Sequence, residues 1–127
     1  MLDYLTDVTS LSLAKSLDGI AARHKVIANN IANVETPGFI RSDVTFEDSL
    51  KQAMESGSDD DIRKSLEDVQ PQTVADETTA AGPNGNNVSI DKEMADLAKN
   101  SLNYESIVQI LNLKSSMLKT AINEGRR

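Results

Sequence analysis

Residues 10–34, SLSLAKSLDGIAARHKVIANNIANV, decide the fold. Apolar residues recur there at alternating spacings of four and three, the heptad pattern of a helix that packs along one seam. Ser10 or Thr9 can cap the start by accepting a backbone N–H bond. Pro37 ends the pattern, because the residue before a proline avoids helical angles. The predicted helix spans residues 10–34, with seam positions Leu13, Leu17, Ile20, His24, Ile27, Ile31 and Val34.

The same spacing returns at the other end of the chain and predicts a second helix over residues 91–123. Ser89 or Asp91 can cap its start. Asp91 and Glu93 favour the positive end of the helix dipole. The simplest architecture pairs the two helices antiparallel, with the middle of the chain folding back between them. The seam of the second helix consists of Ile90, Met94, Leu97, Ser101, Tyr104, Val108, Leu111, Ser115, Leu118 and Ile122.

The C-terminal helix carries a second apolar line, Ile110, Leu113 and Met117, which is termed the outer line; Leu102 extends it less regularly. It lies away from the seam, so one partner helix cannot cover both faces. An apolar line of this length on a small soluble chain usually marks an interaction surface. We therefore expect other subunits to cover it. The alternative is that the middle segment folds over this face.

Three alanines lie beside the seam of the first helix at intervals of seven residues. Small side chains in such a row let a neighbouring helix approach closely. The three positions are Ala14, Ala21 and Ala28.

Length and composition limit the classes of function. A chain of 127 residues is one domain. The absence of cysteine excludes disulfides, thiolate metal sites and a cysteine nucleophile. The only histidine, His24, is expected to be a packed or partly exposed seam residue, since a catalytic role would need a nucleophile and an acid beside it. We therefore predict no enzyme, no metal site and no cofactor.

Charge and hydropathy restrict the partners. The net charge of −7 argues against nucleic acid, because phosphate binding needs a cationic surface. No run of 18 apolar residues is present, so no membrane span is expected. The start, MLDYLTDVTS, lacks the basic residues and apolar run of a cleaved Sec signal.

The middle of the chain, residues 41–90, holds the excess negative charge, with four basic and 11 acidic side chains. Residues 57–61 and 81–87 are rich in glycine and polar residues and predict flexible loops. A short strand and a short helix are both possible near Phe46, and a helix over residues 46–55 is favoured. The predicted fold is thus mostly α: two long terminal helices packed as an antiparallel coiled-coil hairpin, with a flexible acidic middle segment. Its three parts are residues 1–40, 41–90 and 91–127.

Residues 28–41, ANNIANVETPGFIR, form the most specific motif. Three asparagines fall within five positions of a helix, although asparagine is a mediocre helix former. Their amides can bond the following turn or a neighbouring chain; alternatively, they are solvated or cap the helix end. Thr36, Pro37 and Gly38 predict a turn. Phe39 would then anchor the chain segment that leaves it.

This motif resembles the N-terminal signature of flagellar basal-body rod proteins, with matches at Asn30, Asn33, Thr36, Gly38 and Phe39. Residues 87–94 are similar to the segment that opens the terminal helix of that family. The short length, the direct continuation through residues 44–47 and the lack of a large insert resemble the FlgB type, which forms the proximal rod. The FlgC type is the nearest alternative.

The resemblance implies a structural subunit of the rod, the shaft that transmits torque from the membrane ring to the hook. It implies periplasmic assembly after export through the flagellar type III apparatus, without a cleaved signal peptide. The implied partners are other copies of the chain, FlgC- and FlgF-type rod proteins, the membrane-ring protein and a FliE-type junction protein. A cytoplasmic helical adaptor or chaperone is the alternative function.

Overall fold

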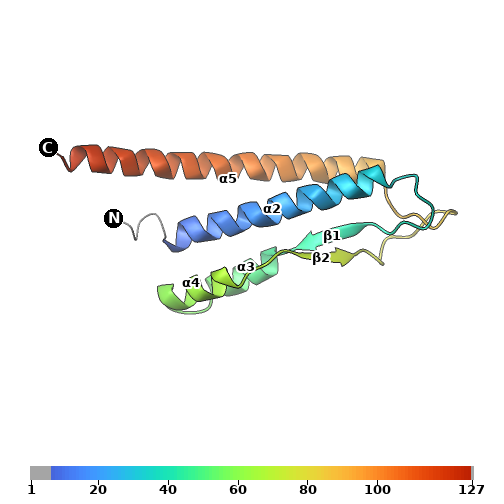
Figure 1. The fold of residues 1–127 in the computed structure, drawn as a ribbon, viewed down its shortest axis with the longest axis horizontal. Coiled ribbons are helices and arrows are strands. Elements are labelled where there is room, and N and C mark those ends of the chain that lie inside the picture. Colours follow the sequence, from blue (N-terminus) through green and yellow to red (C-terminus); the bar gives the residue numbers. More distant parts are fainter. Residues whose placement is uncertain (1–6, 127) are drawn as a thin grey trace.

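Two long antiparallel helices dominate the computed structural model, which describes residues 7–126. They lie side by side, and the start of the first and the end of the second are at the same end of the molecule (Figure 1). This confirms the mostly helical fold with two long terminal helices. The expectation about a Sec signal rests mainly on residues 1–6, which lie outside the described range. The elements are α2 (Val8–Ala32), β1 (Ser42–Thr45), α3 (Glu47–Met54), α4 (Asp59–Glu67), β2 (Gln72–Ala75) and α5 (Ile90–Glu124).

The residue that caps the start of α5 is one that the sequence predicted, whereas the residue that caps the start of α2 is not. Ser89 caps α5, accepting a hydrogen bond from the backbone N of Lys92 at 3.4 Å. At α2 the cap is Asp7, whose Oδ1 accepts from the backbone N of Ser10 at 2.8 Å. The predicted caps Ser10 and Thr9 are wrong because both already lie in the first helical turn. A capping side chain must precede that turn to reach its unpaired N–H groups.

Helix α2 is the central layer of the molecule. Figure 1 shows α5 on one side of α2, and the paired strands β1 and β2 with α3 and α4 on the other. The strands pair antiparallel, with Ser42 opposite Ala75 and Thr45 opposite Gln72. A two-stranded sheet is marginal alone, so its packing on α2 supports it. Two small clusters of buried apolar residues result: Ile20, Val44 and Phe46; and Ala53, Leu66 and Val69.

A glycine inside α2 allows the middle segment to approach closely. The Phe46 ring lies against Gly19, where an added Cβ would be only 2.5 Å from ring atoms. The guanidinium of Arg23 stands over the same ring, 5.0 Å from its centroid. This position therefore needs a residue without a side chain, although glycine weakens a helix interior by about 0.5–1 kcal/mol relative to alanine.

The middle segment has more regular structure than the sequence predicted. The short helix favoured for residues 46–55 is present as α3, and a strand precedes it. The loop predicted for residues 57–61 is wrong, because Asp59 to Asp61 form the first turn of α4. Ser58 and Asp61 make a reciprocal capping box, and acidic side chains are favourable at the positive end of a helix. Residues 81–87 lack helix and strand, but Asn86 and Asn87 are buried.

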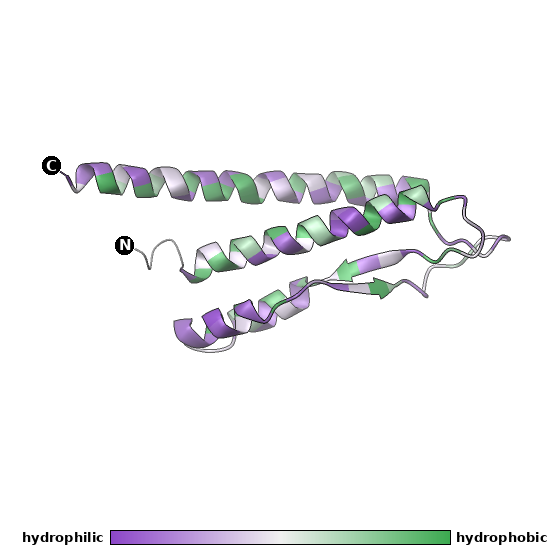
Figure 2. Ribbon diagram, in the orientation of Figure 1, coloured by the Kyte–Doolittle hydropathy of each residue, from purple (hydrophilic) through white to green (hydrophobic). Residues whose placement is uncertain are grey.

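Apolar residues are unevenly distributed over the layers. Figure 2 shows that they recur along the whole of α5, whereas α4 is mostly hydrophilic. Within residues 7–126, no helix combines the length and the hydropathy needed to cross a bilayer.

Candidate assembly site

Asn30, from the middle of the sequence motif, joins three elements. The side chain is buried near the end of α2. Its Oδ1 accepts from the backbone N of Ser42 at 3.0 Å, and its Nδ2 donates to the Ser42 carbonyl at 2.8 Å. Nδ2 also donates to Oε2 of Glu93 at 3.2 Å. One amide therefore satisfies both backbone groups of Ser42 in β1 and binds α5.

A buried ion pair lies beside this amide. Arg41 is 2% exposed and Glu93 is 0% exposed. Arg41 donates from Nε to Oε1 of Glu93 at 2.6 Å and from Nη1 to Oδ2 of Asp76 at 2.7 Å. The hairpin joint is the name used below for Asn30, Arg41, Asp76 and Glu93. Removing one partner of such a pair is strongly destabilising, because a buried charge is left uncompensated.

Hydrogen bonds favour the charged forms of two side chains in the hairpin joint, Arg41 and Asp76. Burial opposes the charged form of Arg41, but the hydrogen bonds to Glu93 and Asp76 raise its pKa. Hydrogen bonds from Thr78 and Thr79, followed by that from Arg41, hold the pKa of Asp76 well below its ordinary value. Both directions favour the charged forms of Arg41 and Asp76.

Two asparagines in the loop before α5 bind the hairpin joint and the turn that follows α2. Asn87 accepts from the backbone N of Arg41 at 2.7 Å and donates to the Asp76 carbonyl at 2.7 Å. Asn86 donates to the carbonyls of Asn33 and Thr36, each at 2.8 Å. These bonds hold the turn that follows α2 against the loop that precedes α5.

The rest of the motif forms the turn after α2. Asn33 donates to the Asn29 carbonyl at 2.8 Å and accepts from Oγ1 of Thr36 at 3.2 Å. Gly38 has a φ of 72°, which a side chain would disfavour, and donates to the Asn84 carbonyl at 2.9 Å. Pro37 is exposed and Phe39 is half-buried. Of residues 28–41, Asn30 and Arg41 enter the hairpin joint.

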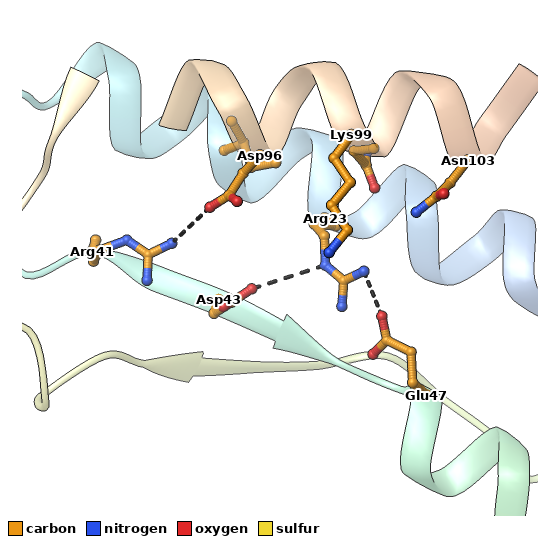
Figure 3. A pocket seen from close by; sticks show the side chains of 9 residues that line it. Arg23, Arg41, Asp43, Glu47, Asp96, Lys99 and Asn103 are labelled. Atoms are coloured by element: carbon orange, nitrogen blue, oxygen red, sulfur yellow. Dashed lines mark ion pairs between the residues drawn. The ribbon is translucent and has the colours of Figure 1, made fainter. Parts of the chain in front are cut away.

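A polar cavity of about 240 Å³ lies between α2, β1 and α5. Figure 3 shows Arg23 paired with Asp43 and Glu47, while Lys99 and Asn103 reach the cavity from α5. Burial opposes ionisation of Glu47, but the hydrogen bond from Arg23 lowers its pKa below the ordinary value. The paired charges hold α2 against the middle segment. Among residues 7–126, no three potential ligands are grouped closely enough to hold a metal ion.

Two further polar contacts tie α2 to α5 away from the joint. Nδ2 of Asn100 donates to the Ile20 carbonyl at 3.0 Å, and this side chain is buried. Near the start of α2, Lys114 donates to both carboxylate oxygens of Asp7 at 2.6 Å. Burial opposes ionisation of Asp7, but the hydrogen bonds from Lys114 and Ser10 lower its pKa. Polar contacts therefore tie α2 to α5 at three places along their length, at Glu93, Asn100 and Lys114.

Some of the α5 residues that are buried against α2 are not those that the heptad pattern predicted. Glu93 and Asn100 are buried, whereas their predicted neighbours Met94 and Ser101 are exposed. Met94 and Tyr104 are half exposed in the single chain, and their part in assembly stays a prediction. Ile20 and Ile27 are buried; Leu13, Leu17, Ile31, Leu97, Val108, Leu111, Leu118 and Ile122 are half-buried.

The outer line is uncovered. Ile110 is 48% exposed, Leu113 63% and Met117 58%, and Leu102 is similarly exposed at 64%. The middle segment packs on α2 and leaves this face of α5 open. The alternative in which the middle segment folds over it is therefore wrong. This face of α5 is open to solvent in the single chain.

Residues 21–39, which include Asn30 and the turn, match the family model described as flagella basal body rod protein. The flagellar basal body rod protein FlgB of Bacillus subtilis is 36% identical over 123 residues, covering 93% of this chain and 95% of that protein. The chain belongs to the FlgB family. FlgB of Borrelia hermsii is 38% identical, covering 80% of this chain and 86% of that protein. FlgB of Escherichia coli K12 is 28% identical, with 98% and 99% covered.

FlgB-family membership confirms the prediction of a structural rod subunit that is not an enzyme. It also decides against the alternative of a cytoplasmic adaptor or chaperone. The polar groups between α2, β1 and α5 are therefore best understood as structural ties between elements of a rod protein.

Sequence reasoning missed most of the polar ties. Glu93 and Asn100 lie seven residues apart and face α2, so a polar pair at heptad spacing was a signal available in the sequence. Asp76, Asn86 and Asn87 lie in a segment that composition alone assigns to solvent-exposed loops.

Proposed function

We propose that this FlgB-family subunit builds the proximal rod through its terminal helices, with neighbouring subunits covering the outer line of α5. The exposure of Ile110, Leu113 and Met117 is the observation that carries the proposal. Fully burying one side chain of this size contributes about 1.5–3 kcal/mol relative to leaving it exposed. A line of three such side chains therefore favours assembly over a free chain.

The construction of the hairpin suits transmission of torque. Polar contacts cross between α2 and α5 at Glu93, Asn100 and Lys114, which are spread along most of their shared length. Each contact has a defined donor and acceptor, so it resists sliding of one helix along the other. A stiff unit of this kind can pass rotation from the membrane ring to the hook.

The proposed partners are other copies of this chain, FlgC- and FlgF-type rod proteins, and at the base the membrane-ring protein and a FliE-type junction protein. The proposed route is export through the flagellar type III apparatus without a cleaved signal, followed by assembly in the periplasm. The absence of cysteine supports this route, because an exported chain then cannot form wrong disulfides in an oxidising compartment.

Electron microscopy of basal bodies from a strain lacking the gene tests the proposal. The expected result is membrane rings without rods, with rods regained when the gene is restored. Intact rods and hooks in the deletion strain would contradict it. The export route is followed separately, by measuring the chain in the culture medium of a strain whose type III apparatus is inactivated. Secretion that continues there would contradict that route.

A further inference from the structure

We propose that the outer line of one copy docks in an apolar groove between α2 and α5 of a second copy. The inference rests on the proposed assembly through α5 and names the surface that receives the outer line. Each subunit then offers a donor face and an acceptor face, and the contact repeats from copy to copy.

The acceptor is a groove on the side of the hairpin where Ala21 and Tyr104 face outward. Its volume is about 560 Å³, and its lining is predominantly apolar. Ile20 and Asn100 are its buried lining residues, while His24 and Tyr104 line its exposed part. Such a groove between two helices can accept the side chains of a third helix.

The donor and acceptor faces lie on opposite flanks of α5. Tyr104 in the groove and Leu113 in the outer line are nine residues apart, which corresponds to about two and a half helical turns. Their side chains therefore leave α5 in opposite directions. One chain cannot place its own outer line in its own groove, so the occupant must come from another molecule.

Side-chain size favours a second copy as that molecule. Ala14, Ala21 and Ala28 are all exposed on α2, and Ala21 belongs to the groove. The outer line presents larger side chains, including the exposed Leu113 and Met117. Large side chains on one helix and small ones on the other let two helices approach closely. The three alanines of α2 then pack against the outer line of the second copy.

Charge also favours this pairing. Ile110, Leu113 and Met117 are uncharged, and Lys114, which lies within their span, is bound to Asp7 of its own chain. The groove has one residue of each sign, Lys25 and Glu105, and both are exposed. An uncharged line therefore enters the groove without bringing a charge out of water, whereas insertion of a charged residue would cost free energy.

The contact is heterologous, because the two surfaces that meet are different. A heterologous contact does not close as a twofold dimer; repeated, it gives a ring or an open helix. This is the symmetry that a rod requires.

Cysteine cross-linking tests the inference cleanly, because the chain has no cysteine of its own. The double variant Ala21→Cys/Leu113→Cys is produced in cells that assemble basal bodies, and rods are treated with a short bifunctional thiol reagent. The expected product is a ladder of dimers, trimers and larger oligomers. Leu113→Cys alone should give no dimer. The matched control Ala21→Cys/Asn112→Cys should give no ladder, because Asn112 is exposed but lies about 100° around α5 from Leu113, away from the outer line.

A second pair, Ser101→Cys/Leu113→Cys, tests the same groove from α5. Absence of a ladder from both pairs in assembled rods would overturn the inference and leave the proposed rod function standing. Dimers from Leu113→Cys alone would show a symmetric contact and overturn it too. So would cross-linking of Leu113→Cys to a different rod protein. Loss of rods in the deletion strain, described above, is independent of all these results.

Discussion

The hairpin joint and the outer line are two regions of one molecule that are built on opposite principles. In the joint, Arg41 and Glu93 are almost completely withdrawn from water and their polar groups are bound within the chain. In the outer line, apolar side chains such as Leu113 stay in water. The joint therefore determines the internal geometry of the subunit, whereas we propose that the outer line makes the contacts between molecules. Substitutions in the joint should lower the free energy of unfolding, whereas substitutions in the outer line should impair rod assembly.

The largest effect on stability is expected from Glu93→Ala. It leaves the Arg41 guanidinium buried without its principal partner, and breaking a buried ion pair in this way costs about 3–5 kcal/mol. Denaturant unfolding of the purified chain measures the loss. The matched control is Asp96→Ala, because Asp96 lies 4.0 Å from Arg41 and its side chain is 40% exposed. It should cost about 1 kcal/mol or less. Equal losses for the two variants would contradict the special role of the joint.

Asn30→Ala tests the neutral part of the joint. It removes the bonds to both backbone groups of Ser42, and an unsatisfied buried group costs about 1–3 kcal/mol. Amide hydrogen exchange at Ser42 should become faster than in the parent chain. Asn29→Ala, at the exposed neighbouring position, serves as the control. Unchanged exchange at Ser42 in Asn30→Ala would show that the amide does not hold β1.

The smallest effect is expected at the far end of the hairpin, from Lys114→Ala. The bond to Lys114 helps to lower the pKa of Asp7 below its ordinary value of 3.8. A lowered carboxylate pKa stabilises the folded state above the unfolded pKa, and this contribution is lost as the pH falls through the folded pKa. At pH 7 the variant should lose about 1 kcal/mol or less.

The pH dependence of this variant provides the sharper comparison. Between the parent chain and Lys114→Ala, the stability difference should shrink as the pH falls from the ordinary carboxylate pKa of 3.8 through the lower folded-state pKa of Asp7. Unfolding curves at neutral and acidic pH measure it. If the stability difference between the two chains grew as the pH was lowered, the result would contradict a stabilising contact between Lys114 and ionised Asp7.

The periodicity of the sequence predicted the long helices and the outer line well. Both follow from the fixed angle between successive helical residues, so a line such as Ile110, Leu113 and Met117 keeps its direction whatever the tertiary structure. The exposure of Leu113 could thus be expected before the fold was known.

Tertiary contacts account for what the sequence could not predict. The α5 seam contains Glu93 and Asn100, and a pattern search assigns such polar residues to the solvent face although partners from α2 and β1 satisfy them here. The pairing of β1 with β2 joins segments such as Val44 and Thr73, with two helices between them and no hairpin turn to indicate it. Helix α4 was missed because its three aspartates resemble a loop unless Ser58 is recognised as a cap.

Leu113→Asp provides the most direct test of the difference between the two regions. Because Leu113 is 63% exposed, unfolding of the purified variant should occur within about 0.5 kcal/mol of the parent chain. Basal bodies carrying the variant should nevertheless lack rods by electron microscopy, while Asn112→Asp, at an exposed position that faces away from the outer line, should assemble them. Normal rods in a stable Leu113→Asp variant would contradict assembly through the outer line.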